Sequence, residues 1–454
     1  MFRYPLPYQA DSRAYFLAIA DMPWAMWLDS GGRGRFDILT AHPIATLVTQ
    51  GEQTEIGGVA AEWRSDADPL DLIREQLGVK ATNSPDIPYA GGALGYWSYD
   101  LARRWFMLPN LAQEAEHLPE MAVGIYDWAL VVDHQLHTAQ LVSHLRHPQT
   151  EVFLHHIAER FDTVNDCGQA GAERAFRVAS TISSNFTRAR YETAFDTVQR
   201  YLHSGDCYQV NLAQRFSVHA QGDALTAYLA LREISPAPFS AFLSLPQAQI
   251  MCASPERFLR VENGHVETKP IKGTRPRGAD AEEDAMRLAD LRTHPKDRAE
   301  NLMIVDLLRN DLGRCCLPGS VHTPTLFEIE SYSNVHHLVS TVTGELAPSE
   351  DALSLLRACF PGGSITGAPK QRAMQIIEEL EPHRRGVYCG AIGYIGYDGN
   401  MDSNIAIRTL VLAENNLRCW AGGGIVADSI AEAEYQETLD KAAGMLALLR
   451  MFGG

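Results

Sequence analysis

Residues Met121–His134 read MAVGIYDWALVVDH, and they form the clearest β-strand pattern in the chain. β-Branched and aromatic residues dominate the stretch, and such residues fit the half-buried surface of a sheet. Gly91–Trp97 and Tyr388–Tyr397 show the same character. The chain is therefore expected to contribute strands both early and late in its sequence.

The remaining elements follow from apolar periodicity and from capping residues. Thr187 is a good helix N-cap, and Pro369 suits the first turn of a helix. The expected helices are Pro148–Phe161, Arg188–His203, Asp297–Asn310, Lys370–Leu380 and Ile430–Leu449. The expected strands are Cys207–Val218, Ala248–Val261, Ser403–Ala413 and Leu417–Ala421. Clustered strands with helices between some of them favour an α+β fold over a regular βαβ winding.

The pattern also suggests how the chain is divided. Residues 1–145 form an N-terminal part, residues 146–175 a helix and linker, and residues 176–454 a second part. Asp162–Glu173, which is rich in Asn, Asp, Gly and Gln, is the best linker candidate.

Composition excludes several classes of function. The 454 residues are 46% hydrophobic and 21% charged, as in folded soluble proteins, and the formal charge is −17. An acidic chain argues against nucleic acid or an anionic membrane as the main partner. No apolar run has the length of a signal peptide or a membrane span. None of the eight cysteines forms a C-x-x-C pair, so a reducing cytoplasm is expected.

Lys272 is the most informative single residue. It follows Pro270-Ile271, and Gly273 after it permits close approach of the backbone to a ligand. A lysine facing a pocket would be a candidate covalent nucleophile, whereas one facing water would be an ordinary strand residue. The local sequence leaves both alternatives open.

Two helices carry spaced acidic residues. Asp297 and Glu300 are three positions apart, while Glu434, Glu437 and Lys441 follow at i, i+3 and i+7, so each set shares roughly one helix face. Carboxylates from two helices can form an oxygen-rich Mg²⁺ site. Two solvated helix faces would give the same spacing.

Two glycine-rich segments suit an anion. Gly362–Lys370 (GGSITGAPK) is not a phosphate loop, because its lysine does not follow the second glycine directly. It still leads into a helix N-terminus, which suits a carboxylate or phosphate, or it is a structural turn. Gly422–Gly424 follows a strand and permits either close backbone approach or a bulge.

Three isolated residues remain open at this level. Arg408, in the apolar run NIAIRTL, needs an anionic partner if buried, which would be a substrate carboxylate or a structural acid. Glu256 precedes Arg257 and could simply pair with it. His337 has the character of an ordinary core or surface histidine. No G-x-S-x-G motif supports a serine hydrolase.

Taken together, these motifs resemble those of the chorismate-utilising enzymes. The motifs that carry the resemblance, densest over residues 187–445, are PIKGT, DRAENLMIVDLLRNDLGR, GGSITGAPKQRAM, CGAIGY, AGGGIVADS and EAEYQETLDKA. PWAMWLDS and MAVGIYDWALVVDH resemble the branch that aminates chorismate at C4. The resemblance implies an α+β fold, an interwoven two-sheet antiparallel β-sandwich with helices packed outside and the active site between the sheets.

The resemblance also implies roles for site residues. Glu300 and Glu437 would bind Mg²⁺, with Glu434 and Asp297 nearby, directly or through water. Chorismate contacts would come from Gly273, Thr274, His337, Ser364, Tyr388, Arg408, Gly422, Gly423, Gly424 and Lys441. A tryptophan pocket would be formed by Ser30, Arg35, Phe36, Pro238, Phe239 and Ser240.

Two positions indicate which reaction is expected. Gln209 stands where relatives that activate water carry a lysine, and Lys272 marks the C4-aminating branch. The implied mechanism has Lys272 attack C2 of chorismate while Glu256, as general acid, protonates the departing C4 hydroxyl. Ammonia would then add at C4 and expel Lys272.

The expected partners are chorismate, ammonia and a separate glutamine amidotransferase subunit, because the chain shows no glutaminase segment. Two alternatives remain. One is the anthranilate-forming branch of the family, and the other is a non-catalytic subunit that binds chorismate or tryptophan.

Overall fold

Two large antiparallel sheets frame the molecule in the computed structural model, which describes all residues except 59–61, 163–174, 333–334 and 454. The first sheet runs in the order β1 (Phe2–Leu6), β10 (Thr138–Ser143), β9 (Ala129–Asp133), β3 (Phe36–Thr40), β2 (Ala25–Asp29), β14 (Phe239–Ser244), β15 (Gln249–Ser254), β24 (Thr409–Ala413), β25 (Asn416–Ile425), β13 (Gln209–Gly222) and β11 (Phe176–Val178). Two short strands, β12 (Ser183–Ser184) and β21 (Gly367–Ala368), also pair with β13.

The second sheet lies against the first. Its order is β18 (Ile271–Pro276), β20 (Val335–Glu345), β17 (His265–Thr268), β16 (Arg257–Glu262), β23 (Met401–Ile405), β22 (Ala391–Gly396), β7 (Gly92–Trp97), β8 (Met121–Tyr126), β4 (Ala45–Gln50), β5 (Gln53–Gly58) and β6 (Trp63–Ser65), with β19 (His322–Ser331) beside β20. The predicted two-sheet antiparallel α+β fold is confirmed.

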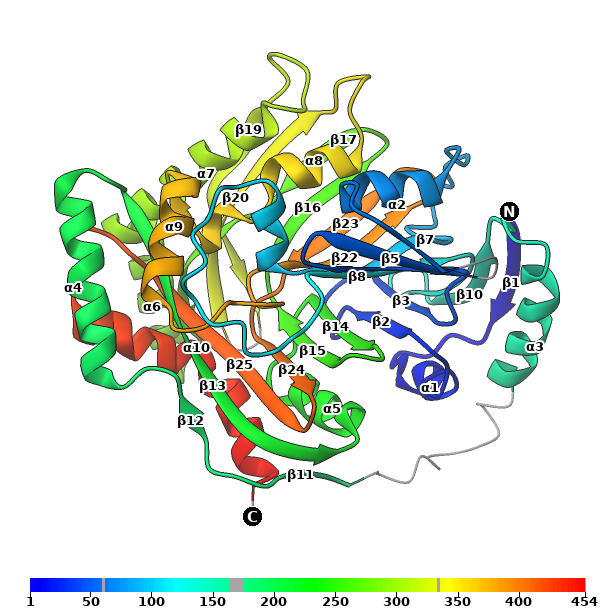
Figure 1. Cartoon of the computed structure of the whole chain (residues 1–454), viewed down its shortest axis with the longest axis horizontal. Coiled ribbons are helices and arrows are strands. Elements are labelled where there is room, and N and C mark those ends of the chain that lie inside the picture. The colour runs from blue at the N-terminus through cyan, green and yellow to red at the C-terminus, as the bar shows by residue number, and fades with distance from the viewer. Residues whose placement is uncertain (59–61, 163–174, 333–334, 454) are drawn as a thin grey trace.

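Early and late segments of the chain share both sheets. In the first sheet β2 pairs with β14, and in the second β7 pairs with β22. Gly95 and Gly393 lie opposite each other where β7 pairs with β22. A Cβ on Gly95 would come within 2.1 Å of the Ala122 carbonyl oxygen, so this position has no room for a side chain. The N-terminal strands, blue in Figure 1, therefore complete sheets that later residues begin.

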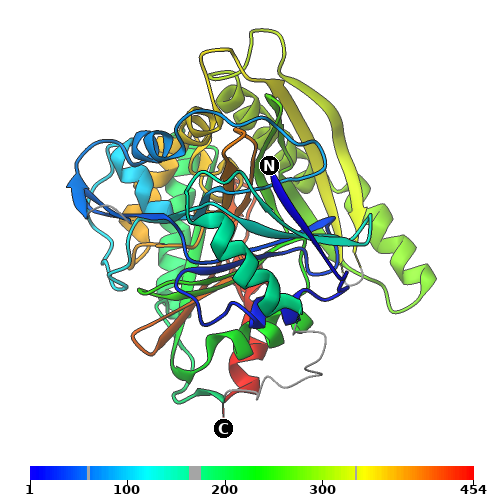
Figure 2. The same ribbon diagram turned by 90° about the vertical axis from the view of Figure 1, so that its right-hand side faces the viewer.

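The helices cover the outer faces (Figures 1 and 2). They are α1 (Arg13–Leu17), α2 (Pro69–Leu77), α3 (Thr150–Asp162), α4 (Arg188–Ser204), α5 (Ala224–Ile234), α6 (Ala281–Thr293), α7 (Pro295–Leu312), α8 (Ala352–Cys359), α9 (Lys370–Leu380) and α10 (Ala431–Met451). α10 packs on β25, α4 and α5, whereas α7 packs on β18 and β20. The five predicted helices form close to their expected bounds, and the Thr187 side chain caps α4.

Three predicted strands are broken, because the chain passes from one sheet to the other within each. Met121–His134 becomes β8 and β9, Ala248–Val261 becomes β15 and β16, and Ser403–Ala413 becomes β23 and β24. Both halves of each stretch are apolar, so the local pattern does not show the break. These crossovers place Glu256 and Arg408 between strands rather than within them.

One further predicted strand is shorter in the structure than its sequence pattern indicated. Tyr388–Tyr397 forms a strand only over β22, because its first residues belong to a turn. The linker predicted at Asp162–Glu173 falls almost wholly outside the described residues, and the division at 145 and 176 stays a prediction. No helix in the described part of the chain is long and apolar enough to cross a membrane.

Candidate functional site

Lys272 lies on β18 at an irregularity in its pairing with β20. The register shifts between Ile271 and Thr274, and Gly273 has φ +87°, which favours glycine. A bulge of this kind re-aims a side chain out of the regular sheet. Lys272 is half-buried, and its Nζ donates a hydrogen bond to the Ser364 carbonyl at 3.1 Å.

Glu256 meets Lys272 from the crossover between β15 and β16. The Glu256 side chain is buried, and this burial raises its pKa. A hydrogen bond with the Ser364 side chain and the charge of Lys272 act in the opposite direction. Ser364 itself is buried in the short helix Gly363–Ile365, within the predicted anion loop. A buried carboxyl with a raised pKa is suited to donating a proton.

A carboxylate cluster lies where α7 and α10 meet. Glu434 Oε1 accepts hydrogen bonds from Ser429 Oγ at 2.6 Å and from Lys296 Nζ at 2.9 Å, whereas its Oε2 is buried without a partner. Burial raises the pKa of Glu300, against the opposing charges of Lys272 and Lys296. Glu437 pairs with Lys441 at 2.6 Å.

The side chains of this cluster have the chemistry of ligands for a hard metal ion. In the described residues, no three Asp, Glu, His or Cys side chains already converge as a metal site. The donors near one another are nevertheless all carboxylate oxygens, which hard cations prefer, and one of them is buried without a hydrogen bond. The residues therefore fit a hard divalent cation, and Mg²⁺ stays a prediction.

Asp297 differs from the other predicted ligands. Its carboxylate pairs with Arg275 at 2.9 Å and with His294 at 3.2 Å. It also lies against Gly273, since a Cβ on that glycine would come within 3.0 Å of Asp297 Cγ. This carboxylate is already engaged by two cationic or protonatable groups, which disfavours direct metal ligation.

The three glycines of β25 each lie against a different side chain of the site. Lys441 Nζ donates to the Gly422 carbonyl at 3.0 Å, and a Cβ on Gly423 would come within 3.1 Å of Glu434 Oε2. A Cβ on Gly424 would come within 2.7 Å of Gln209 Nε2. β25 pairs with β13 in unbroken register through all three, so the bulge alternative is wrong.

Gln209, which stands where water-activating relatives were expected to carry a lysine, is the first residue of β13. It is fully buried, and neither its Oε1 nor its Nε2 has a hydrogen-bond partner. An unpaired buried amide is costly, so this side chain is poised to bind a polar group.

Arg408 and His337 lie near each other. Arg408 has φ +50°, and within the described structure its side chain forms no hydrogen bond or ion pair, although its backbone carbonyl accepts a hydrogen bond from Ala253 N at 3.1 Å. Burial lowers the pKa of Arg408. Burial and the charge of Arg408 lower the pKa of His337 to about 4, and its Nδ1 is 2.8 Å from Thr274 Oγ1. His337 is therefore neutral at physiological pH, and Arg408 offers an unpaired fork for a carboxylate.

Tyr388 lies in the turn before β22. It is buried and stacks on Trp420 with the ring centroids 6.0 Å apart. The structure thus brings Lys272, Glu256 and Ser364 together, and it places the carboxylate cluster and the β25 glycines next to them.

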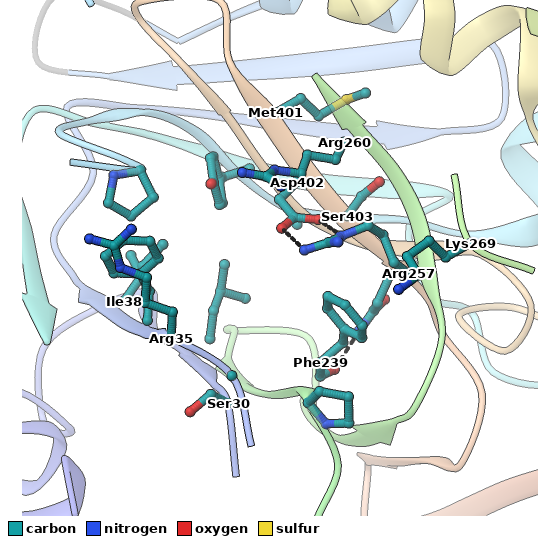
Figure 3. A pocket seen from close by; sticks show the side chains of 18 of the residues that line it. Ser30, Arg35, Ile38, Phe239, Arg257, Arg260, Lys269, Met401, Asp402 and Ser403 are labelled. Carbon is teal, nitrogen blue, oxygen red and sulfur yellow. Dashed lines mark hydrogen bonds and ion pairs between the residues drawn. The ribbon is translucent and has the colours of Figure 1, made fainter. Parts of the chain in front are cut away.

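A separate cavity of about 450 Å³ lies between the N-terminal strands and the second sheet. All six residues predicted for a tryptophan pocket line it. Figure 3 shows Ser30 and Arg35 on one side, with Arg257, paired to Asp402, across from them. The buried Ser30 Oγ has no hydrogen-bond partner. Lys272 does not line this cavity, although Ile271 does.

Lys296 is the functional candidate that sequence reasoning missed. It lies in the first turn of α7, four residues before Glu300, and it reaches Glu434 on α10. The only local signal is an i,i+4 Lys–Glu spacing, which is also typical of exposed helix surfaces.

Comparisons with known proteins give the relatives of this chain. The model of the chorismate binding enzyme family matches residues 24–447. Aminodeoxychorismate synthase component 1 of Escherichia coli is 50% identical over 439 residues, which cover 95% of this chain and 94% of that protein. Anthranilate synthase component 1 of Thermus thermophilus is 37% identical over 442 residues, covering 96% and 95%. The crystal structure of anthranilate synthase component I from Streptococcus pneumoniae superposes with a TM-score of 0.81 at 33% identity, covering 91% and 92%.

Proposed function

Because the chain belongs to the family of chorismate-binding enzymes, we propose that it aminates chorismate at C4 to give 4-amino-4-deoxychorismate. The observation that carries this proposal is the position of Lys272. Its Nζ contacts the Ser364 carbonyl and lies within electrostatic reach of Glu256, Glu300 and Glu437. The relatives that are about half identical bear the name of this activity.

In the proposed reaction the neutral Lys272 amine forms a bond to C2 of the chorismate ring. The ring double bonds shift, the C4–O bond breaks, and Glu256 gives its proton to the departing hydroxyl, which leaves as water. Ammonia then forms a bond to C4, the double bonds shift back, and the C2–Nζ bond breaks. Glu256 recovers a proton from the incoming nitrogen, so atoms and charges balance.

The remaining side chains hold the two carboxylates of chorismate. Arg408 provides a bidentate fork for the enolpyruvyl carboxylate, with Tyr388 beside it. Glu300, Glu434 and Glu437 would hold Mg²⁺ next to the ring carboxylate, while Asp297 would reach it only through water. When bound, Mg²⁺ neutralises that carboxylate and withdraws electrons from the ring.

Ammonia is proposed to come from a separate glutamine amidotransferase subunit, in the cytoplasm. All cysteines in the described part of the chain are buried free thiols, and their burial raises the pKa of the Cys252 and Cys359 thiols, so none resembles a glutaminase nucleophile. Formation of para-aminobenzoate, on the route to folate, would then require another enzyme.

Product analysis tests the proposed reaction. The purified chain is incubated with chorismate, ammonium and Mg²⁺, and the products are separated by chromatography with mass detection. We expect 4-amino-4-deoxychorismate with pyruvate retained. Fluorescent anthranilate together with free pyruvate would contradict the proposal in favour of the anthranilate-forming branch, and no turnover would indicate a non-catalytic subunit. Adding the amidotransferase subunit should let glutamine replace ammonium.

The cavity beside the site is proposed to bind tryptophan. Its volume of about 450 Å³, its apolar residues and the unpaired Ser30 Oγ suit an amino acid with an aromatic side chain. Tryptophan should raise the midpoint of thermal unfolding of the wild type, and Ser30→Ala should reduce that shift. An unchanged midpoint, in protein that contains no tryptophan as purified, would contradict this assignment.

A further inference from the structure

One lysine lies inside the carboxylate cluster between α7 and α10. Lys296 Nζ is 2.9 Å from Glu434 Oε1 and 3.8 Å from Glu300 Oε1, so it bridges the two helices. It is also 3.5 Å from Ser429 Oγ. The Glu434 side chain is almost fully buried, whereas 36% of the Lys296 side chain is exposed. The carboxylate is therefore fixed, and the lysine has room to move into solvent.

The charges at this place are nearly balanced without a metal. Glu437 is paired with Lys441 at 2.6 Å and the charge of Lys272 acts on Glu300, whereas Lys296 is within ion-pair distance of both Glu300 and Glu434. Without Lys296, the buried Glu434 carboxylate would lose its ion pair and would face Glu300, which would keep the longer-range attraction of Lys272. Like charges in a poorly solvated place repel strongly, and removing one partner of such a pair is destabilising.

A divalent cation held by Glu300 and Glu434 would lie beside the ammonium group that contacts one oxygen of each. The unpaired Glu434 Oε2 could take up a cation at once, but Oε1 is shared by the ammonium group and by Ser429. An ammonium group and a divalent cation cannot both approach the same carboxylate oxygen closely, because they repel each other.

We propose that Lys296 is a built-in counter-cation, which keeps the carboxylates of α7 and α10 together in the metal-free protein. When Mg²⁺ binds, it displaces the Lys296 ammonium group toward solvent. This inference rests on the Mg²⁺ site proposed above. It makes the cluster preformed and stable before the metal arrives. It also makes metal binding weaker and readily reversible, because every Mg²⁺ that binds must displace an ammonium group.

The test compares Mg²⁺ binding and metal-free stability in four proteins. Lys296→Met removes the cation, and Lys296→Gln removes the charge while keeping a hydrogen-bond donor if the first variant folds poorly. Lys80→Met is the matched control, since Lys80 is an exposed lysine that contacts none of these carboxylates. Each full-length chain is titrated with MgCl₂ by isothermal calorimetry without chorismate, and its thermal unfolding is followed in a chelator and in saturating MgCl₂.

We expect the dissociation constant for Mg²⁺ to fall about tenfold in both Lys296 variants, or about 1.4 kcal/mol, and to stay unchanged in Lys80→Met. In chelator the Lys296 variants should unfold at a lower temperature than the control, and saturating Mg²⁺ should remove most of that difference. Unchanged or weaker Mg²⁺ binding in the Lys296 variants, with normal binding in the wild type, would overturn the counter-cation role alone. Absence of Mg²⁺ binding in all four proteins would overturn the metal site as well.

Discussion

Glu256 has the properties of a proton donor because of where it is buried. It lies at a crossover between the two sheets, and burial raises its pKa. The hydrogen bond with Ser364 and the charge of Lys272 act on the same carboxyl group and lower its pKa. A carboxyl group in this environment holds its proton at a higher pH than an ordinary glutamic acid. The proposed acid role therefore follows from its place between the sheets.

Glu256→Gln should abolish proton donation while preserving shape. We expect kcat with ammonium to fall by about 10²- to 10⁴-fold, with a much smaller change in the KM for chorismate. Steady-state kinetics on the purified variant measure both constants. A variant with the kcat of the wild type would contradict the assignment.

The same residue predicts the direction of the pH dependence. Only the protonated carboxyl can donate, so the rate should fall as pH rises through the raised pKa of Glu256. This decline should be absent from the residual rate of Glu256→Gln. An identical decline in both proteins would assign it to another group.

Glu116 predicts a pH effect on stability that is independent of catalysis. Burial raises its pKa from 4.5 to about 8 against the opposing charges of Arg418 and Arg215, and both of its carboxylate oxygens lack hydrogen bonds. The folded protein thus holds a proton that the unfolded chain releases, so stability falls as pH rises from 4.5 toward about 8.

Glu116→Gln should therefore unfold at a higher temperature than the wild type above pH 8, and at nearly the same temperature below pH 4.5. Calorimetry across this range measures the difference. A gap that does not change with pH would show that Glu116 does not titrate between these limits.

At the scale of elements, the crossovers between sheets build the site. β15 leads to Glu256 and then to β16 in the other sheet, and β23 leads to Arg408 and then to β24. Each crossover presents a polar side chain at the point where the chain passes from one sheet to the other. Two polar groups of the site, Glu256 and Arg408, therefore lie at breaks between strands.

Arg408→Met tests the crossover arginine. Loss of a charged bidentate contact should raise the KM for chorismate by about 10- to 100-fold. Loss of an unpaired, poorly solvated charge should meanwhile raise the unfolding temperature of the ligand-free protein. Enzyme kinetics measure the KM for chorismate, and thermal unfolding measures the stability of the ligand-free protein. A variant that is destabilised and binds chorismate normally would show that Arg408 is structural.

The helices could be predicted from sequence, but the crossovers could not. α4 and α9 form where Thr187 and Pro369 indicated, because caps and apolar periodicity act locally. The break at Arg408 depends on which sheet accepts each half of an apolar run, and that is decided by partners far away in the sequence. The place of Lys296 in the carboxylate cluster could not be predicted for a similar reason, since its contact with Glu434 joins two helices that are far apart in the sequence.

At the scale of the whole molecule, neither part of the chain completes a sheet alone. β14 requires β2, and β22 requires β7. The main hydrophobic core likewise combines early and late residues, such as Leu94, Ile125 and Ile392. The site thus depends on the N-terminal strands, although they contribute none of its proposed catalytic residues.

A fragment of residues 176–454 should therefore fail to fold cooperatively. Two strand edges and the apolar surface of the core would be exposed, which favours aggregation. Circular dichroism with thermal unfolding of the purified fragment tests this. A soluble fragment with a cooperative transition and normal turnover would contradict the account of the fold.

The central claim is that Lys272 bonds covalently to the substrate, and intact-protein mass spectrometry tests it most directly. The protein is mixed with chorismate and Mg²⁺ without ammonia and is then denatured at once. The account predicts an added mass equal to chorismate less one water, located on Lys272 by peptide mapping and missing from Lys272→Ala. No adduct in the wild type, together with full amination activity in Lys272→Ala, would contradict it.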